Sequence, residues 1–226
     1  MITQRCIISR KRSLVESIVP IDTRPKKIIR VASSLPPRLL LSESAKKSSK
    51  TSPEQCFIAC LESEGIKAQI HNFRSVQHLF EHPKREEIEA YGLKAIEAVR
   101  KRDVEGLRGL LAEGHPLKCS NKHGESILHL ACRKAFVEVA DFLINEAQVP
   151  LWVMDDFGRN PCHDACWTVE PNFQLMDLII EKCPDLLLIS DARGHTPLAY
   201  VRHSHWEQWI DYLTAKAKCL RPTKLP

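Results

Sequence analysis

Apolar residues recur three to four positions apart in two stretches of the chain, at 137–144 and 173–180. This spacing predicts two amphipathic helices, each with one side buried. A small residue, Ala131 or Ala165, stands before each stretch and allows a preceding helix to approach closely. The side chains expected to form the apolar layer are Val137, Val139, Phe142, Leu143, Phe173, Leu175, Leu178 and Ile179. The pattern therefore predicts paired helices that pack on their neighbours.

A polar turn of constant composition precedes these pairs and returns once more downstream. Asn121, Asp155 and Asp191 each stand three residues before a glycine, and the glycines lie 34 and then 36 residues apart. An Asp or Asn side chain holds a tight turn through hydrogen bonds to nearby backbone, and glycine adopts the backbone conformation that the turn needs. Pro161 and Pro197 fall in the first helical turn, where a missing N–H costs nothing.

The three runs that carry this pattern are GESILHLAC at 124–132, GRNPCHDAC at 158–166 and GHTPLAY at 194–200. A period in the low thirties with these residues resembles the ankyrin repeat and its T-P-L-H-x-A signature. The resemblance implies an all-α solenoid of stacked helix-turn-helix units with short hairpin-like loops. It also implies that His129 and His163 form hydrogen bonds between adjacent loops.

We expect the ankyrin-repeat domain to span residues 92–217, with repeats at 92–120, 121–154, 155–190 and 191–217. The first repeat is degenerate: its apolar residues align with those of the second at an offset of 33, but it lacks the turn. The last repeat is expected to be the C-terminal cap of the array, followed by a short tail at 218–226.

The N-terminal segment, residues 1–51, differs in composition from the rest. Residues 1–50 hold twelve Lys and Arg against three Asp and Glu, so the overall net charge of +5 leaves the remainder mildly acidic. This Ser- and Pro-rich segment predicts a disordered basic tail. Three interpretations stay open: a solvated linker, a nuclear-localisation or acidic-partner patch at 10–12 and 24–27, and an organelle presequence.

A short helical lead-in is expected between the tail and the repeats, over residues 52–91. Ser52 and Pro53 predict a helix start, and Gly65 predicts its stop. Between 66 and 82 the pattern is mixed. It leaves open whether the four apolar residues there dock on the array or await a partner; they are Phe73, Val76, Leu79 and Phe80.

The chain has nine cysteines, an odd number without a repeating framework, which indicates reduced thiols. Cys162, His163 and Cys166 suggest a metal site as an alternative, but the repeat pattern places both cysteines in packing positions. We find no phosphate-binding glycine loop, no paired carboxylates in a credible cleft and no oriented nucleophile. We therefore expect no catalytic residues, no cofactor and no metal, and the protein is not predicted to be an enzyme. No apolar run is long enough for a transmembrane segment.

The function that the resemblance implies is protein binding by an adaptor or scaffold, through loop tips and the exposed inner-helix face. The candidate tip residues are Lys122, His123, Asp156, Phe157, Arg159, Arg193 and His195. The candidate inner-helix residues are Arg133, Lys134, Trp167 and Thr168. Phe157 and Trp167 are the expected anchors, because aromatic residues dominate interface hot spots. Trp167 lies in an insertion, so it is either a local plug or an exposed recognition element.

The partner is expected to be a protein of unknown identity, bound by a monomer in the cytoplasm or nucleus, or in an organelle if the presequence interpretation holds. Two alternatives stay open. One is a nuclear regulator whose basic tail, and only the tail, contacts nucleic acid while the repeats recruit a partner. The other is a cysteine-based metal or redox sensor.

Overall fold

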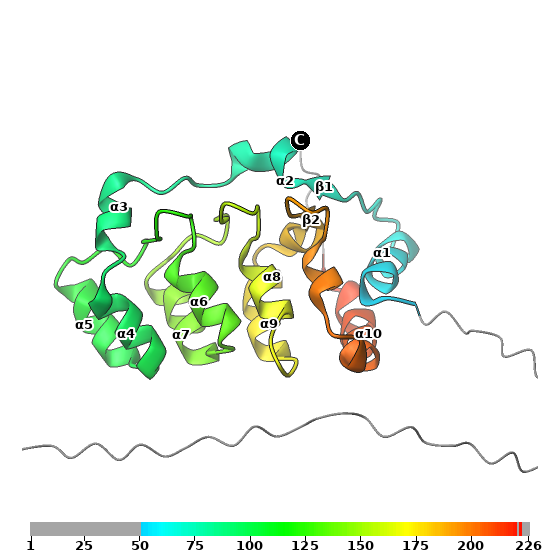
Figure 1. Cartoon of the computed structure of the whole chain (residues 1–226). Coiled ribbons are helices and arrows are strands. Elements are labelled where there is room, and N and C mark those ends of the chain that lie inside the picture. The colour runs from blue at the N-terminus through cyan, green and yellow to red at the C-terminus, as the bar shows by residue number, and fades with distance from the viewer. Residues whose placement is uncertain (1–50, 221, 223–226) are drawn as a thin grey trace, which may run out of the picture. The chain divides into compact units, whose positions relative to one another are not determined.

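The computed structural model describes residues 51–220 and 222, and in this part of the chain helix pairs stack side by side in one row (Figure 1). The first three pairs are α4 (Leu93–Lys101) with α5 (Val104–Ala112), α6 (Ile127–Arg133) with α7 (Val137–Asp141), and α8 (Pro161–Cys166) with α9 (Phe173–Ile180). A π-helical turn, η2 (Phe142–Glu146), extends α7. The all-α solenoid expected from the sequence is confirmed. The predicted basic tail lies outside the described residues.

The fourth repeat keeps its second helix but shortens its first. Its elements are η4 (Pro197–Tyr200), η5 (His203–His205) and α10 (Trp206–Ala217), preceded by η3 (Pro184–Leu188) and β2 (Ile189–Ser190). In repeats 2 and 3, Ser126 and Asn160 cap the first helix by accepting a backbone N–H of its first turn. Thr196 holds the equivalent place, yet its hydroxyl donates to Glu54 instead of capping η4.

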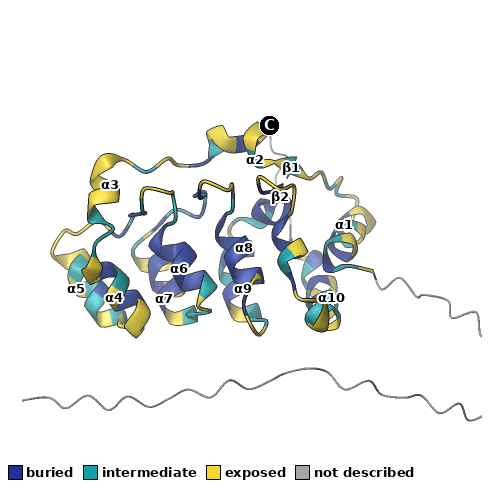
Figure 2. Cartoon of the chain, in the orientation of Figure 1, coloured by how far each residue is buried: buried dark blue, intermediate teal, exposed yellow. Residues whose placement is uncertain are grey.

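One apolar core runs through the whole row. Each second helix, with its extension, supplies a fully buried leucine or isoleucine: Leu107, Leu143, Ile179 and Leu213. Figure 2 shows the facing sides of the helices buried and the turns between them exposed. None of the described helices is long and apolar enough to cross a bilayer.

Helix α1 (Pro53–Ser63) packs against α10, at the end of the row opposite to repeat 1 (Figure 1). Ser52 and Gln55 form a reciprocal capping box at its start, and Phe57 and Leu61 bury their side chains to 1% and 0% exposure. The expectation that the fourth repeat ends the array is therefore wrong. An N-terminal helix covers it, because α10 has an apolar side that no later repeat buries.

Residues 64–91, which we call the strap, return from α1 to repeat 1 along the hairpins (Figure 1). The strap contains β1 (His71–Asn72), α2 (Phe73–Val76), η1 (Gln77–Leu79) and α3 (Arg85–Ala90). Strand β1 pairs in parallel with β2, directly before the hairpin of repeat 4. The N–H of Glu81 then donates to the Trp152 carbonyl (2.8 Å), shortly before the hairpin of repeat 3, and the N–H of Ser120, directly before the hairpin of repeat 2, donates to the Glu87 carbonyl (3.4 Å).

The strap thus binds the segment before the hairpin in repeats 4, 3 and 2, in that order. Its apolar residues settle the question that the sequence left open, since Val76 and Phe80 are buried and Phe73 and Leu79 are half-buried. The Phe80 ring meets Trp152 edge-on, with 5.2 Å between ring centroids. These residues dock on the array.

Two equivalent glycines, Gly158 and Gly194, differ in how closely the strap approaches them. A Cβ at Gly158 (φ +73°) would lie 2.5 Å from the Phe73 ring, whereas a Cβ at Gly194 (φ +82°) would meet no atom within 4 Å. Gly194→Ala should cost about 1 kcal/mol through backbone strain alone. Gly158→Ala should cost about 2–3 kcal/mol because the strap must also shift. Urea unfolding measures both, and equal losses would contradict this seating.

Candidate functional site

Each hairpin is held by the side chain of its first residue. In repeat 3, Oδ1 of Asp155 accepts the backbone N–H groups of Phe157 and Arg159, both at 2.9 Å. Asn121 and Asp191 make the same two contacts in repeats 2 and 4, at 2.8–3.1 Å. Because this anchor recurs, the tip side chains between its contacts are presented in the same way in all three repeats.

Backbone hydrogen bonds also join each tip to the next. The N–H of Asp156 donates to the His123 carbonyl (2.9 Å), and the N–H of Ala192 donates to the Phe157 carbonyl (2.8 Å). Nδ1 of His123 lies 2.7 Å from the Asp156 carboxylate. The tips therefore form a continuous ridge that needs no partner to order it.

Two buried histidines link the first helices to the following hairpins. Nδ1 of His129 accepts the N–H of the residue that caps its helix (3.2 Å), so Nε2 carries the proton and donates to the Arg159 carbonyl (3.0 Å). His163 repeats this arrangement, accepting from Asn160 (3.1 Å) and donating to the His195 carbonyl (3.1 Å). The inter-loop role that the resemblance implied for both histidines is confirmed.

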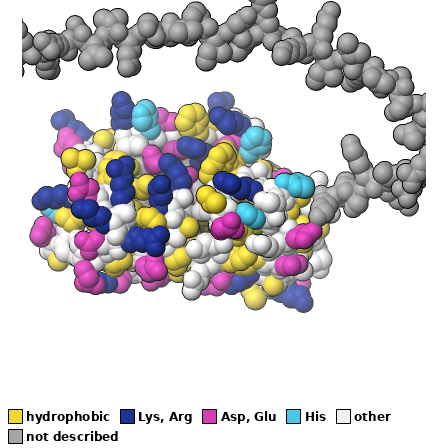
Figure 3. All heavy atoms as spheres, turned by 60° about the horizontal axis from the view of Figure 1, so that its bottom comes forward, with side chains coloured by type: hydrophobic (Ala, Val, Ile, Leu, Met, Phe, Trp, Pro, Cys, Tyr) yellow, Lys and Arg dark blue, Asp and Glu magenta, His cyan; other side chains and the backbone are white. Residues whose placement is uncertain are grey.

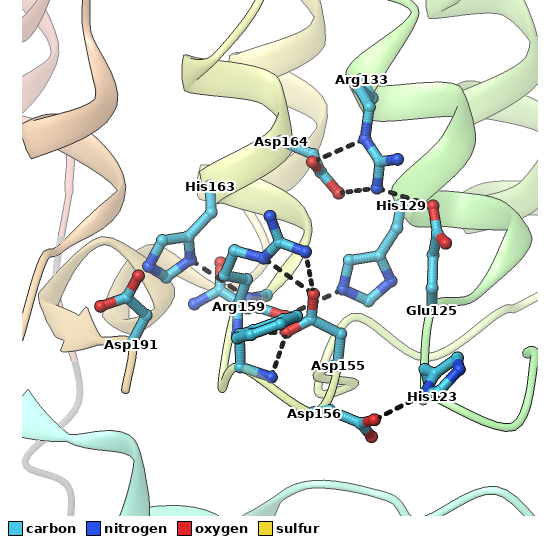
Figure 4. A network of polar contacts seen from close by, with 12 residues as sticks. His123, Glu125, His129, Arg133, Asp155, Asp156, Arg159, His163, Asp164 and Asp191 are labelled. Carbon is cyan, nitrogen blue, oxygen red and sulfur yellow. Dashed lines mark hydrogen bonds and ion pairs between the residues drawn. The ribbon is translucent and has the colours of Figure 1, made fainter. Parts of the chain in front are cut away.

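Ion pairs hold the arginines of this face in fixed positions (Figure 4). Arg133 donates to both oxygens of Asp164 (3.0 and 3.1 Å) and lies 2.6 Å from Glu125. Arg159 donates twice to Asp155, at 2.8 and 2.5 Å. The hydrogen bond to Asp164 raises the pKa of Arg133 further above its ordinary value, although partial burial lowers it. Both guanidinium groups therefore stay charged and are prepositioned.

An open pocket of about 240 Å³ lies between the first helices of repeats 2, 3 and 4. Its lining residues are Arg133, Arg159, His163, Asp164, Trp167 and Tyr200. The Trp167 and Tyr200 rings lie 5.3 Å apart between centroids, and Trp167 remains 57% exposed. The pocket thus has an aromatic wall and a polar floor.

Tyr200 is fixed by a hydrogen bond from its hydroxyl to the Asp191 carboxylate (2.5 Å). Burial and this bond raise the pKa of Tyr200 to about 12. The phenol therefore stays protonated at neutral pH, and its ring keeps one orientation beside Trp167.

A family model described as ankyrin repeats, in three copies, matches residues 95–185. Residues 95–185 therefore contain ankyrin repeats. The match covers the degenerate first repeat as well as the second and third, so the offset of 33 residues identified a true copy. The fourth repeat extends the same row beyond the matched residues.

The relatives found among curated proteins share a short region with this chain. SMC5-SMC6 complex localization factor protein 1 of Homo sapiens is 33% identical over 79 residues, and the Bos taurus protein of the same name is 32% identical over 79 residues. The aligned region is 35% of this chain but 7% of either relative. The chain therefore corresponds to a small part of those proteins.

Most of the residues expected to contact a partner lie at the surface. The exposed ones are Lys122, His123, Lys134, Asp156, Phe157, Trp167, Arg193 and His195, and the half-buried ones are Arg133 and Arg159. Thr168 was placed on this face wrongly. It is 7% exposed, and its hydroxyl donates to the carbonyls of Ala165 and Glu170, which closes the insertion.

Phe157 and Trp167, the two expected anchors, each contact a neighbouring side chain and remain more than half exposed. Trp167 is in part a plug, since it packs on Tyr200, yet more than half of it faces solvent. Phe157 is 55% exposed and lies under the guanidinium of Arg159, 5.1 Å from its ring centroid. The pocket of about 240 Å³ is lined by Trp167 but not by Phe157.

Sequence reasoning missed Tyr200 and Asp164. Both occupy the variable x of the T-P-L-H-x-A signature, the helix position next to the alanine that packs inward. That offset could have identified them. What it could not show is that Tyr200 would meet Trp167, since the two residues come from different repeats.

The three most buried cysteines of repeats 2 and 3 behave as packing residues. Cys132, Cys162 and Cys166 are at most 3% exposed, and burial raises the pKa of each thiol. Thiols of this kind stay protonated and unreactive at neutral pH. Among residues 51–220 and 222, no group of three or more His, Cys, Asp or Glu side chains is arranged to hold a metal ion.

Proposed function

We propose that this protein is a non-enzymatic interaction module that binds a protein partner through its hairpin tips and inner-helix face. Ankyrin repeats are generally protein-interaction modules. The observation that carries the proposal is Trp167, a large aromatic side chain 57% exposed at the rim of a pocket of about 240 Å³. Exposed aromatics beside a pocket are the usual anchors of protein interfaces.

The rigidity of this face supports the same function. Arg133, Arg159 and Tyr200 are already held by carboxylates, and the tips are joined by backbone hydrogen bonds. A partner would therefore pay little ordering entropy on binding, which leaves more of the contact energy as affinity.

The name of the relatives extends this proposal to a cellular role. Their name describes a factor that localises a protein complex. By analogy, the array would bring its partner to a place in the cell, acting as a monomeric adaptor in the nucleus or cytoplasm. The alternative, that the basic tail contacts nucleic acid, rests on the charge of residues 1–50 alone.

The experiment is affinity capture from native extract with the full chain and a double variant, Phe157→Ala with Trp167→Ala. Aromatic hot spots cost about 2 kcal/mol or more each when truncated, so partner recovery should fall at least about tenfold. Mass spectrometry measures recovery for each partner.

The matched control removes exposed apolar surface elsewhere, with Ile70→Ala and Leu93→Ala, which are 41% and 76% exposed. This variant should recover the partner normally. Equal recovery by all three proteins would refute binding through this face.

A further inference from the structure

We call the surface formed by the hairpin tips and the exposed side of the first helices the ankyrin face. On this face the acidic side chains have partners within the chain, whereas several basic side chains have no ion-pair partner among the described residues. Here the acidic side chains are already engaged: Glu97 with Lys101, Glu125 and Asp164 with Arg133, Asp155 with Arg159, Asp156 with His123, Asp191 with Tyr200, and Glu170 with His205. In contrast, Arg100, Lys122, Lys134 and Arg193 form no side-chain ion pair with any described residue. Among the described residues, these four cations therefore lack an ion-pair partner, whereas each of these carboxylates has a hydrogen-bonding or ionic partner.

The free cations come from three repeats: Arg100 lies in the first, Lys122 and Lys134 lie in the second, and Arg193 lies in the hairpin of the fourth. Arg100 is equivalent in the repeat to Arg133, which lines the pocket. Arg193 stands two residues after Asp191, the carboxylate that holds Tyr200 of the pocket wall. Figure 3 brings the bottom of Figure 1 forward and shows Lys and Arg side chains spread over that face, with acidic and apolar side chains among them. A ligand that crosses several repeats would meet free cations from repeats 1, 2 and 4.

The pocket itself suits one bulky, uncharged side chain. Its arginines are both paired with carboxylates, Arg133 with Asp164 and Glu125 and Arg159 with Asp155. Its wall is the Trp167–Tyr200 pair. A volume of about 240 Å³ is of the order of one large apolar or aromatic residue.

We propose that this face takes an acidic, extended protein segment, with one bulky apolar side chain in the pocket beside Trp167 and flanking carboxylates on Arg100, Lys134 and Arg193. The inference rests on the proposed function and adds the chemistry of the partner. A nucleic acid fits less well, because a continuous phosphate backbone would also meet the carboxylates of Asp156 and Asp164, whereas a peptide places its anions separately.

The test is selection of random 12-residue peptides displayed on phage against the full chain. Enriched peptides should be rich in Asp and Glu and carry one Leu, Phe or Trp. Their affinity should fall at least about tenfold when the face is reversed with Arg100→Glu, Lys134→Glu and Arg193→Glu.

The matched control reverses three exposed cations away from the face, Lys67, Lys84 and Lys182, each to Glu. Both triple variants change the net charge equally, so attraction of acidic peptides to the basic tail is the same in both. The control should keep the affinity within about twofold. Loss of affinity in both variants alike would overturn the inference.

The remaining outcomes separate this inference from the function it rests on. Enrichment of neutral or basic peptides that depend on Trp167 would overturn the acidic partner and leave protein binding intact. Absence of any Trp167-dependent peptide would count against both. If a 20-nucleotide single strand binds the chain and the reversed face alone abolishes that binding, the partner is nucleic acid and the inference is wrong.

Discussion

Replacing Phe57 with alanine should destabilise the ankyrin array by about 3–5 kcal/mol, although this residue lies outside the repeats. Phe57 is 1% exposed on α1, which packs against α10. Truncation leaves a cavity in the interface that closes the last repeat. Urea unfolding followed by circular dichroism measures the loss.

The region of the array that Phe57→Ala destabilises is as informative as the size of the stability loss. In a repeat array each unit depends on its neighbours, so amide hydrogen exchange should accelerate first in α10 and least in α4. Glu62→Ala changes the exposed side of the same helix and should cost less than about 0.5 kcal/mol. A loss below about 1 kcal/mol for Phe57→Ala would mean that α1 is not the cap.

Acidification from pH 7 to pH 4 should remove about 3 kcal/mol of stability through His163 alone. Burial lowers the pKa of His163 to about 4, from an ordinary value near 6.5. Between these values the unfolded chain binds the proton and the folded chain does not. The contribution is therefore complete above pH 6.5 and is lost as the pH falls towards 4.

His163→Gln isolates this effect, because an amide can still donate to the His195 carbonyl but does not titrate in this range. The variant will be less stable at pH 7, yet its stability should decline less steeply between pH 6.5 and 4. Urea unfolding at half-unit pH steps gives both curves. Parallel curves would show that His163 does not titrate on unfolding as described.

The repeats were predictable because their determinants are local. The turn held by Asp155, the cap at Asn160 and the apolar spacing of α9 each arise within a segment of ten residues or fewer. Each recurs at the same offset, so one segment could be checked against its copies. The exposure of most candidate surface residues could be predicted for the same reason. Thr168 was placed wrongly because it lies in an insertion, which has no copy elsewhere in the chain.

The strap and the pocket could not be predicted in this way. Whether Phe80 docks depends on Trp152, more than 70 residues away, and no periodicity relates the two segments. The aromatic wall likewise needs Trp167 and Tyr200 from neighbouring repeats at one place. Such pairings depend on shape and burial across the folded row, which a linear pattern does not contain.

The sequence by itself therefore determined the repeat, its turns and its buried histidines, because short-range hydrogen bonding and helical periodicity specify them. Only the tertiary structure decided that Phe157 and Trp167 are exposed, that α1 closes the array and that the strap ties three hairpins together. It also decided, for the part of the chain that is described, that the acids of the ankyrin face have partners while Arg100, Lys122, Lys134 and Arg193 form no ion pair. These features depend on which apolar surfaces remain uncovered and which charges meet once the repeats have stacked.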